Sequence, residues 1–85
     1  MVYGYTVADK ANKESFQNAA DFVKNKFGYT AEGKVIEDVD GSLQQQLIKE
    51  GEKVTVISDE QIDYVAIKST IPLPIICIAK WVTNE

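Results

Sequence analysis

A run of carboxylates in the middle of the chain is the stretch richest in groups that could do chemistry. Glu37, Asp38 and Asp40 stand close together and are followed by Gly41 and Ser42. Carboxylate oxygens can bind a divalent cation, and a carboxylate can act as a nucleophile or as an acid and base. The same residue types also build an ordinary turn, because Asp-Gly reverses a chain and Ser can accept from nearby amides. The residues around this run distinguish a reactive site from a turn.

The segment from Asp38 to Leu43 resembles the nucleophile motif of haloacid-dehalogenase-type phosphatases, in which an apolar strand ends in Asp-x-Asp-Gly-Thr-Leu. The resemblance extends over six residues. It implies that Asp38 attacks the phosphoryl group and that Asp40 works as acid and base. It also implies that both carboxylates help to hold a magnesium ion.

Three features of the chain argue against a phosphatase. The strand before the motif should be continuously apolar in a parallel sheet, but Glu37 interrupts it after two apolar residues. Each crossover unit of a parallel sheet takes about 30 residues, and the chain after Leu43 has room for barely one. The later acids Asp59 and Asp63 are expected in one hairpin loop and do not complete a magnesium site. We therefore interpret Asp40-Gly41 as a turn.

The residue types that the chain lacks argue against many enzyme mechanisms. The chain contains no His, which is the commonest general base near neutral pH and the commonest metal ligand. Its one cysteine, Cys77, stands between Ile76 and Ile78, and an apolar setting makes a thiol inert. We predict that Cys77 belongs to the core and that the protein is not an enzyme. No metal or cofactor is expected.

The charge and the remaining composition narrow the class of partner. Thirteen acidic residues against nine Lys give a formal net charge of -4, and no Arg is present. Binding to nucleic acid is disfavoured, because it needs clustered positive charge and relies on Arg for bidentate recognition. A single cysteine forms no internal disulfide, and we find no leader sequence and no apolar run long enough to span a bilayer. We expect a cytoplasmic protein that does not enter a membrane.

The N-terminal third predicts a strand followed by a long helix. Val2 to Val7 is rich in aromatic and β-branched residues, which favour a strand. From Asp9 the period changes, and Gly28 can supply a left-handed stop, with Asp9 or Asn12 as the N-cap. The apolar residues of this segment recur at helical spacing and form one stripe: Phe16, Ala20, Val23 and Phe27.

The segment from Leu43 to Glu50 permits two interpretations. Asp40-Gly41 is a strong two-residue hairpin turn, whereas Ser42 followed by Gln45 is a capping box that opens a helix. We favour a short helix, because LQQQLIKE contains good helix formers and Gly51 stands where a C-terminal stop belongs. The alternative is a strand that continues the hairpin.

The rest of the chain predicts an antiparallel sheet. A short strand is expected within residues 34–39, and three strand-like runs at 53–58, 64–69 and 74–82 are separated by short turns, which favours a meander. The predicted fold is a single α+β domain over residues 1–85. It has an antiparallel sheet of four to five strands, one long N-terminal helix packed on one face, and a short second helix.

A single long helix covers only one face of such a sheet, so the two faces should differ in composition. If a symmetric loop centred on Pro72 joins the last two strands, alternation gives a core face beneath the helix. The residues expected on that face are Val65, Ile67, Ile75, Cys77, Ala79 and Trp81. Val54 and Val56 join them if the hairpin before Tyr64 has a four-residue loop.

The opposite face mixes apolar and polar residues, and its isoleucines need a cover. The short helix 43–50 could fold across it, or a second protein molecule could cover it, and we predict partial cover by the helix together with a protein contact. The partner is another protein or a second copy of the chain in a homodimer, and the protein acts as a regulator, inhibitor or adaptor. The alternative is a small-molecule-binding module that uses a pocket between helix and sheet, with Tyr and Lys as polar handles. The residues expected at the protein interface are Ile57, Tyr64, Lys68, Ile76, Ile78 and Lys80.

Overall fold

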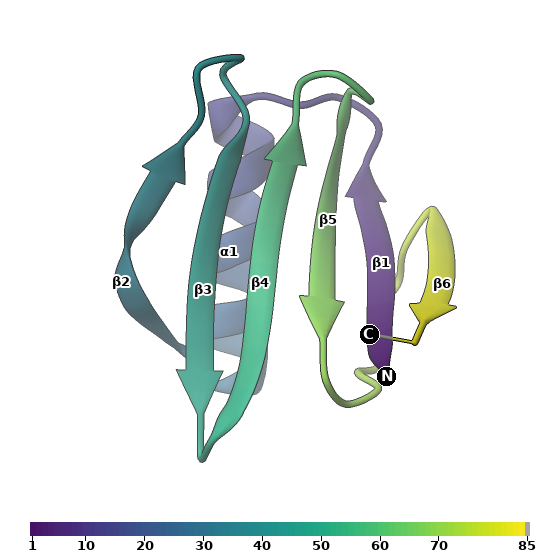
Figure 1. Ribbon diagram of the computed structural model, residues 1–85. Helices are drawn as coiled ribbons and strands as arrows, with labels where there is room; N and C mark the ends of the chain where they lie inside the picture. The colour runs from purple at the N-terminus through teal and green to yellow at the C-terminus, as the bar shows by residue number, and fades with distance from the viewer. Residues whose placement is uncertain (85) are drawn as a thin grey trace.

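An antiparallel sheet with a helix on one face forms the protein, as the computed structural model shows for residues 1–84 (Figure 1). This part of the chain contains β1 (Val2–Ala8), α1 (Lys13–Phe27), β2 (Thr30–Glu37), β3 (Leu43–Lys49), β4 (Glu52–Asp59), β5 (Tyr64–Ser69) and β6 (Ala79–Thr83). The strand order is β2-β3-β4-β5-β1-β6. The predicted α+β class is confirmed. The sheet has six strands in place of the four to five expected.

The long helix forms where the sequence predicts it, and local signals set both of its ends. The side chain of Asn12 accepts from the backbone N–H of Ser15 at 2.8 Å, so Asn12 is the N-cap. Gly28 has a φ of 76° and donates from its N–H to the carbonyl of Lys24, which closes the last turn. The buried residues of the helix are Phe16, Ala19, Ala20 and Val23.

The core lies between α1 and strands β3, β4 and β5. Asp59 pairs with Tyr64, so residues 60–63 form the loop that the face assignment of these two strands required. Four residues predicted for the core face are confirmed there with no exposed surface: Val54, Val56, Val65 and Ile67. The other strand residues of the core include Tyr5, Leu43 and Leu47.

The expected second helix is wrong, because residues 43–49 form strand β3. Leu43 and Leu47 are four residues apart, a spacing that places two side chains on one face in a helix and in a strand alike. Pairing with β2 on one side and β4 on the other satisfies the backbone of this segment in the extended form. Glu50 and Gly51 have φ values of 51° and 82°, as a two-residue hairpin turn of type I′ requires. Gly51 is therefore a turn residue and not a helix stop.

The expected third strand of the meander is also displaced. β1 already occupies the edge of β5 where the next strand would pair. The chain after Ser69 therefore leaves the sheet as an irregular segment, residues 70–78, and returns as β6 on the far side of β1. Pro72 and Pro74 suit this segment, because neither has an N–H to donate to a ladder. The hydroxyl of Tyr5 accepts from the N–H of Leu73 at 2.9 Å, which places the segment over the helix side of β1.

Candidate interaction surface

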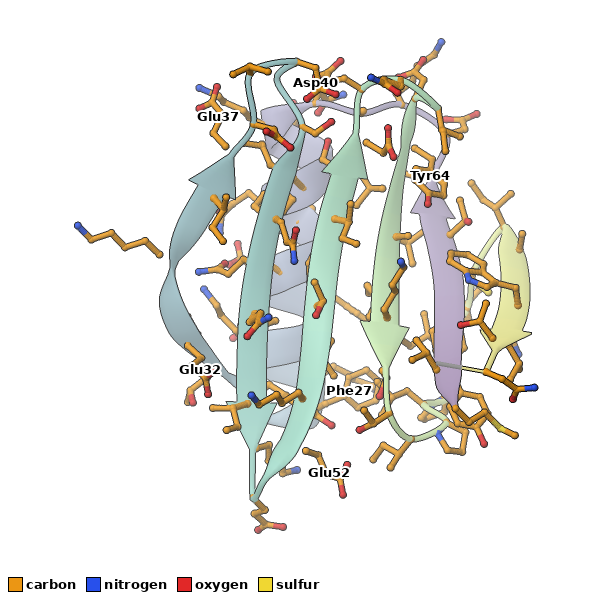
Figure 2. The ribbon with its side chains drawn as sticks, in the orientation of Figure 1. Phe27, Glu32, Glu37, Asp40, Glu52 and Tyr64 are labelled. Atoms are coloured by element: carbon orange, nitrogen blue, oxygen red, sulfur yellow. The ribbon has the colours of Figure 1, made fainter. Side chains whose placement is uncertain are left out.

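The sheet face turned away from α1 is open: no element of residues 1–84 covers it. Figure 2 looks onto this face, with α1 behind the sheet. Residues that pair across the strands form a continuous row in the middle of the face: Gln46, Thr55, Lys68, Gly4 and Trp81. A second row, one pleat away, contains Gln44, Ile57, Ala66, Thr6 and Ala79. We call this surface the open face.

Trp81 and Tyr64 form the most distinctive feature of the open face. Their rings are 6.4 Å apart between centroids and inclined by 16°, so they are nearly parallel. The indole of Trp81 lies directly over Gly4, because a Cβ on Gly4 would overlap the Cε2 atom of the indole. Trp81 therefore reaches from the edge strand across β1 toward β5. Both rings are only half-buried and present aromatic surface to solvent.

The centre of the open face has a different charge from the protein as a whole. Lys68 lies in the central row and makes no ion pair with any residue in 1–84. Near the β2 edge of the same face, Lys53 and Glu32 form an ion pair with 3.8 Å between Nζ and Oε1. The chain has a net charge of -4, so the ammonium of Lys68 lies at the centre of this face on a molecule that is acidic overall.

Only three of the six residues predicted for the interface share the open face. Ile57, Tyr64 and Lys68 lie together there, because β4 and β5 pair with the predicted register. The expectation that the other three join them is wrong. Ile76 and Ile78 belong to the irregular segment 70–78, where they are 98% and 63% exposed.

Lys80, the third, pairs with Tyr5, which faces α1, so it lies on the helix side of β6. The loop assumed to be symmetric about Pro72 does not exist, because the segment passes under β1 instead of turning back along β5. The alternation of the last strand is therefore reversed. Trp81 and Ala79, predicted for the core face, lie on the open face, whereas Ile75 is buried and Cys77 packs partly buried against the core.

One residue in the sequence, Gly4, indicates that a bulky group packs on β1, but the prediction of which residues share a face did not take it into account. A glycine inside a strand marks a place where another group approaches closely. Gly4 interrupts the aromatic and β-branched run of β1. It is the glycine whose missing side chain leaves room for the indole. The sequence of β1 alone does not show that its neighbour is β6, so it could not identify Trp81 as the side chain that packs on Gly4.

Glu37 ends β2, and Asp38 and Asp40 lie in the hairpin turn between β2 and β3. Asp38 donates from its N–H to the carbonyl of Ser42 at 2.8 Å, and Asp40 Oδ1 accepts from the N–H of Ser42 at 2.9 Å. This hydrogen bond holds the pKa of Asp40 below its ordinary value. Gly41 has a φ of 91°. In residues 1–84 no group of acidic or sulfur-bearing side chains is arranged to hold a metal ion.

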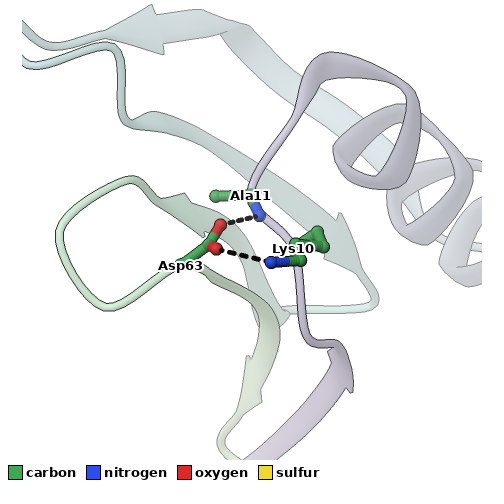
Figure 3. Close-up of polar contacts among 3 residues, drawn as sticks. All are labelled: Lys10, Ala11 and Asp63. Carbon is green, nitrogen blue, oxygen red and sulfur yellow. Dashed lines mark hydrogen bonds and ion pairs between the residues drawn. The ribbon is translucent and has the colours of Figure 1, made fainter.

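A second carboxylate fixes the loop beside the open face. Asp63, which has a φ of 61°, joins the loop 60–63 to the connection between β1 and α1 (Figure 3). Its Oδ1 accepts from the N–H of Ala11 at 2.8 Å, and its Oδ2 lies 3.4 Å from the ammonium of Lys10. The hydrogen bond from Ala11, aided by Lys10, lowers the pKa of Asp63. Tyr64, the next residue, is the first residue of β5.

Replacement of Asp63 by Asn should make the protein less stable near neutral pH, because the charged partner of Ala11 and Lys10 is lost. A carboxyl whose folded pKa is depressed stabilises the fold above its ordinary pKa of 3.8 and loses that contribution as the pH falls through the folded pKa. The difference in Tm between parent and variant should therefore shrink below about pH 4. Thermal melts between pH 3 and pH 7 measure it, and a difference independent of pH would contradict the assignment.

A shallow hollow lies on the other side of the molecule, between α1 and the segment 70–78. Its volume is about 290 Å³. The exposed side chains of Phe22 and Ile76 stand at its rim, and Ser15 and Asn18 supply polar groups. The remaining lining residues are apolar: Val7, Ala19, Ile67 and Ile75. The lining of this hollow contains neither of the polar handles, Tyr and Lys, that the small-molecule alternative predicted. Tyr29, Lys26 and Lys49 instead line a separate hollow of about 320 Å³ at the C-terminal end of α1.

No helix within residues 1–84 is long and apolar enough to cross a membrane. Comparisons with known proteins found no matching family model, no similar curated protein and no similar solved structure. The open face and the hollow are therefore interpreted from their own geometry.

Proposed function

We propose that the protein is a small interaction module that binds another protein through the open face. The observation that carries this proposal is the pair of half-buried aromatic rings, Trp81 and Tyr64, stacked on a sheet face that no element of residues 1–84 covers. Aromatic residues are enriched at the centres of protein interfaces, where they supply a large contact area at a low entropy cost. A cytoplasmic location and the absence of catalysis belong to the same proposal.

The chemistry of the open face specifies the kind of partner. The half-exposed side chain of Ile57 and the two rings offer apolar area, and the neighbouring Gln and Thr side chains offer hydrogen bonds. Lys68 lies in the middle of this face and makes no ion pair within residues 1–84. A complementary surface therefore has an apolar centre with a carboxylate opposite Lys68. We expect an acidic patch on the partner.

Charge reversal at Lys68 is the test of this proposal. Tagged parent protein recovers the partner from its own cells, and the purified partner is then titrated against each variant by calorimetry. Lys68→Glu should weaken binding at least tenfold, because the new carboxylate faces the partner's acidic group. Lys13→Glu, the same change at the exposed start of α1, should leave the affinity unchanged. Equal affinities for parent and Lys68→Glu, or a loss confined to Lys13→Glu, would place the contact elsewhere.

A second function is favoured by the hollow beside α1. Exposure of Phe22 and Ile76 at one rim suits a small apolar ligand with a single polar group near Ser15 and Asn18. In a thermal-shift screen, a metabolite that binds there should raise the Tm of the parent. It should have no effect on Ile76→Glu, whose side chain is exposed and whose fold should persist. A ligand that stabilises both proteins equally binds outside the hollow.

A further inference from the structure

Among the strands of residues 1–84, β2 is the one whose residues are all exposed. It lies at the outer edge, pairs only with β3 and is eight residues long. Val35 and Ile36 are 42% and 62% exposed, although both are β-branched and apolar. A strand that buries none of its side chains contributes little to the core. Its outer backbone groups are a template for pairing with another strand.

The middle of β2 projects outward. Its register with β3 shifts between Glu32 and Ile36, and Figure 1 shows the strand bowed away from β3 in this stretch. Gly33, within the shift, has a φ of 80°, and a Cβ at this position would meet nothing within 4 Å. Because β2 is an edge strand, no strand of residues 1–84 pairs with the outer side of the backbone around Gly33. The other edge strand, β6, offers a shorter edge of five residues.

The sequence of β2 is complementary to itself. We propose that β2 pairs antiparallel with β2 of a second copy, about a two-fold axis at Gly33, so that the protein forms a homodimer. Opposite residues then have numbers that sum to 66. Glu32 of each copy faces Lys34 of the other, which gives two pairs of opposite charge. Ala31 faces Val35 on the helix side, and Thr30 faces Ile36 on the open side.

The charges select this register among its neighbours. An axis at Glu32 would place the two Glu32 carboxylates opposite each other, and an axis at Lys34 would do the same to two ammonium groups. Like charges directly opposite in a sheet are destabilising. A shift of one residue would bring side chains from opposite faces against each other. The axis at Gly33 avoids all of these conflicts.

The dimer is independent of the proposed partner. It uses the outer edge of β2. Trp81 lies on β6, the strand at the opposite edge of the sheet, and Tyr64 lies on β5, which is separated from β6 by β1. Pairing through β2 would join two sheets edge to edge and continue the open face from one copy into the next. A variant that breaks the dimer leaves Lys68 and the aromatic rings in place. The two proposals can therefore fail separately.

Sedimentation equilibrium of the parent and four variants tests the dimer. The parent should show a reversible dimer, and Lys34→Glu should raise the dissociation constant about tenfold or more, because Glu32 would then face a carboxylate in both pairs. Glu32→Lys should have a similar effect, although it also removes the ion pair with Lys53. The double variant E32K/K34E restores opposite charges and should return the constant to within about threefold of the parent.

Lys80→Glu on β6 is the matched control, because it reverses a lysine on the other edge strand. It should leave the dissociation constant unchanged. Circular dichroism checks that every variant is folded, as expected for exposed positions. A parent that stays monomeric up to millimolar concentration would overturn the dimer. Failure of E32K/K34E to restore pairing would overturn the register, and dissociation by Lys80→Glu would move the contact to β6.

Discussion

Replacement of Leu47 by Ala should lower the free energy of unfolding by about 2–5 kcal/mol, as is usual for a leucine with no exposed surface. Leu47 lies in the middle of β3, opposite Val54 of β4, with its side chain in the core beneath α1. The substitution would leave a cavity between sheet and helix. Urea unfolding followed by circular dichroism gives the value.

Gln46→Ala is the matched control, since Gln46 is the adjacent residue and points to the open face. Its effect should stay within about 0.5 kcal/mol, as for most exposed positions. A large loss of stability from Leu47→Ala and almost none from Gln46→Ala would show that buried and exposed side chains alternate along β3. Similar losses at both positions would contradict the burial pattern of β3.

Replacement of Gly4 by Ala should also destabilise the protein, by about 1–3 kcal/mol, although Ala normally suits a strand interior better than Gly. The reason is the indole of Trp81, which occupies the space that the new Cβ would need. The ring must move off β1, and its near-parallel stack with Tyr64 is lost. The tryptophan emission should shift to longer wavelength as the ring enters water.

A double-mutant cycle separates this effect from a change in backbone preference. In a Trp81→Ala background the space above Gly4 is empty, so Gly4→Ala should stabilise the protein by about 0.5–1 kcal/mol. The sign of the effect thus reverses between the two backgrounds. The same loss of stability in both would show that Trp81 does not cover Gly4.

Elements governed by local interactions could be predicted from the sequence. The helix depends on an apolar stripe, the Asn12 cap and Gly28, all within a few residues of the helix itself. The hairpin of β4 and β5 depends on the loop 60–63, where the Asp59 carboxylate at the end of β4 accepts from the N–H groups of Gln61 and Ile62. These features fixed the faces of Ile57, Tyr64 and Lys68 correctly.

Elements governed by pairing between distant segments could not be predicted in the same way. Helix propensity favoured a helix at 43–50, and only the two neighbouring strands make the extended form better. The position of β6 depends on β1, which follows the start of the chain and takes the free edge of β5. That long-range contact reverses the face of Trp81, so the ring that stacks on Tyr64 was missed.

Photo-crosslinking inside the cell tests the central claim, that the open face is the binding surface. A photoreactive amino acid is placed at Thr55, which lies between Gln46 and Lys68 in the central row of the open face, and in a matched protein at Asn25, on the exposed side of α1. If the open face binds the partner, the photoreactive residue at Thr55 should form a discrete covalent adduct with another protein. The substitution Lys68→Glu should abolish this adduct, and the photoreactive residue at Asn25 should form none. An adduct from Asn25 together with none from Thr55 would contradict it.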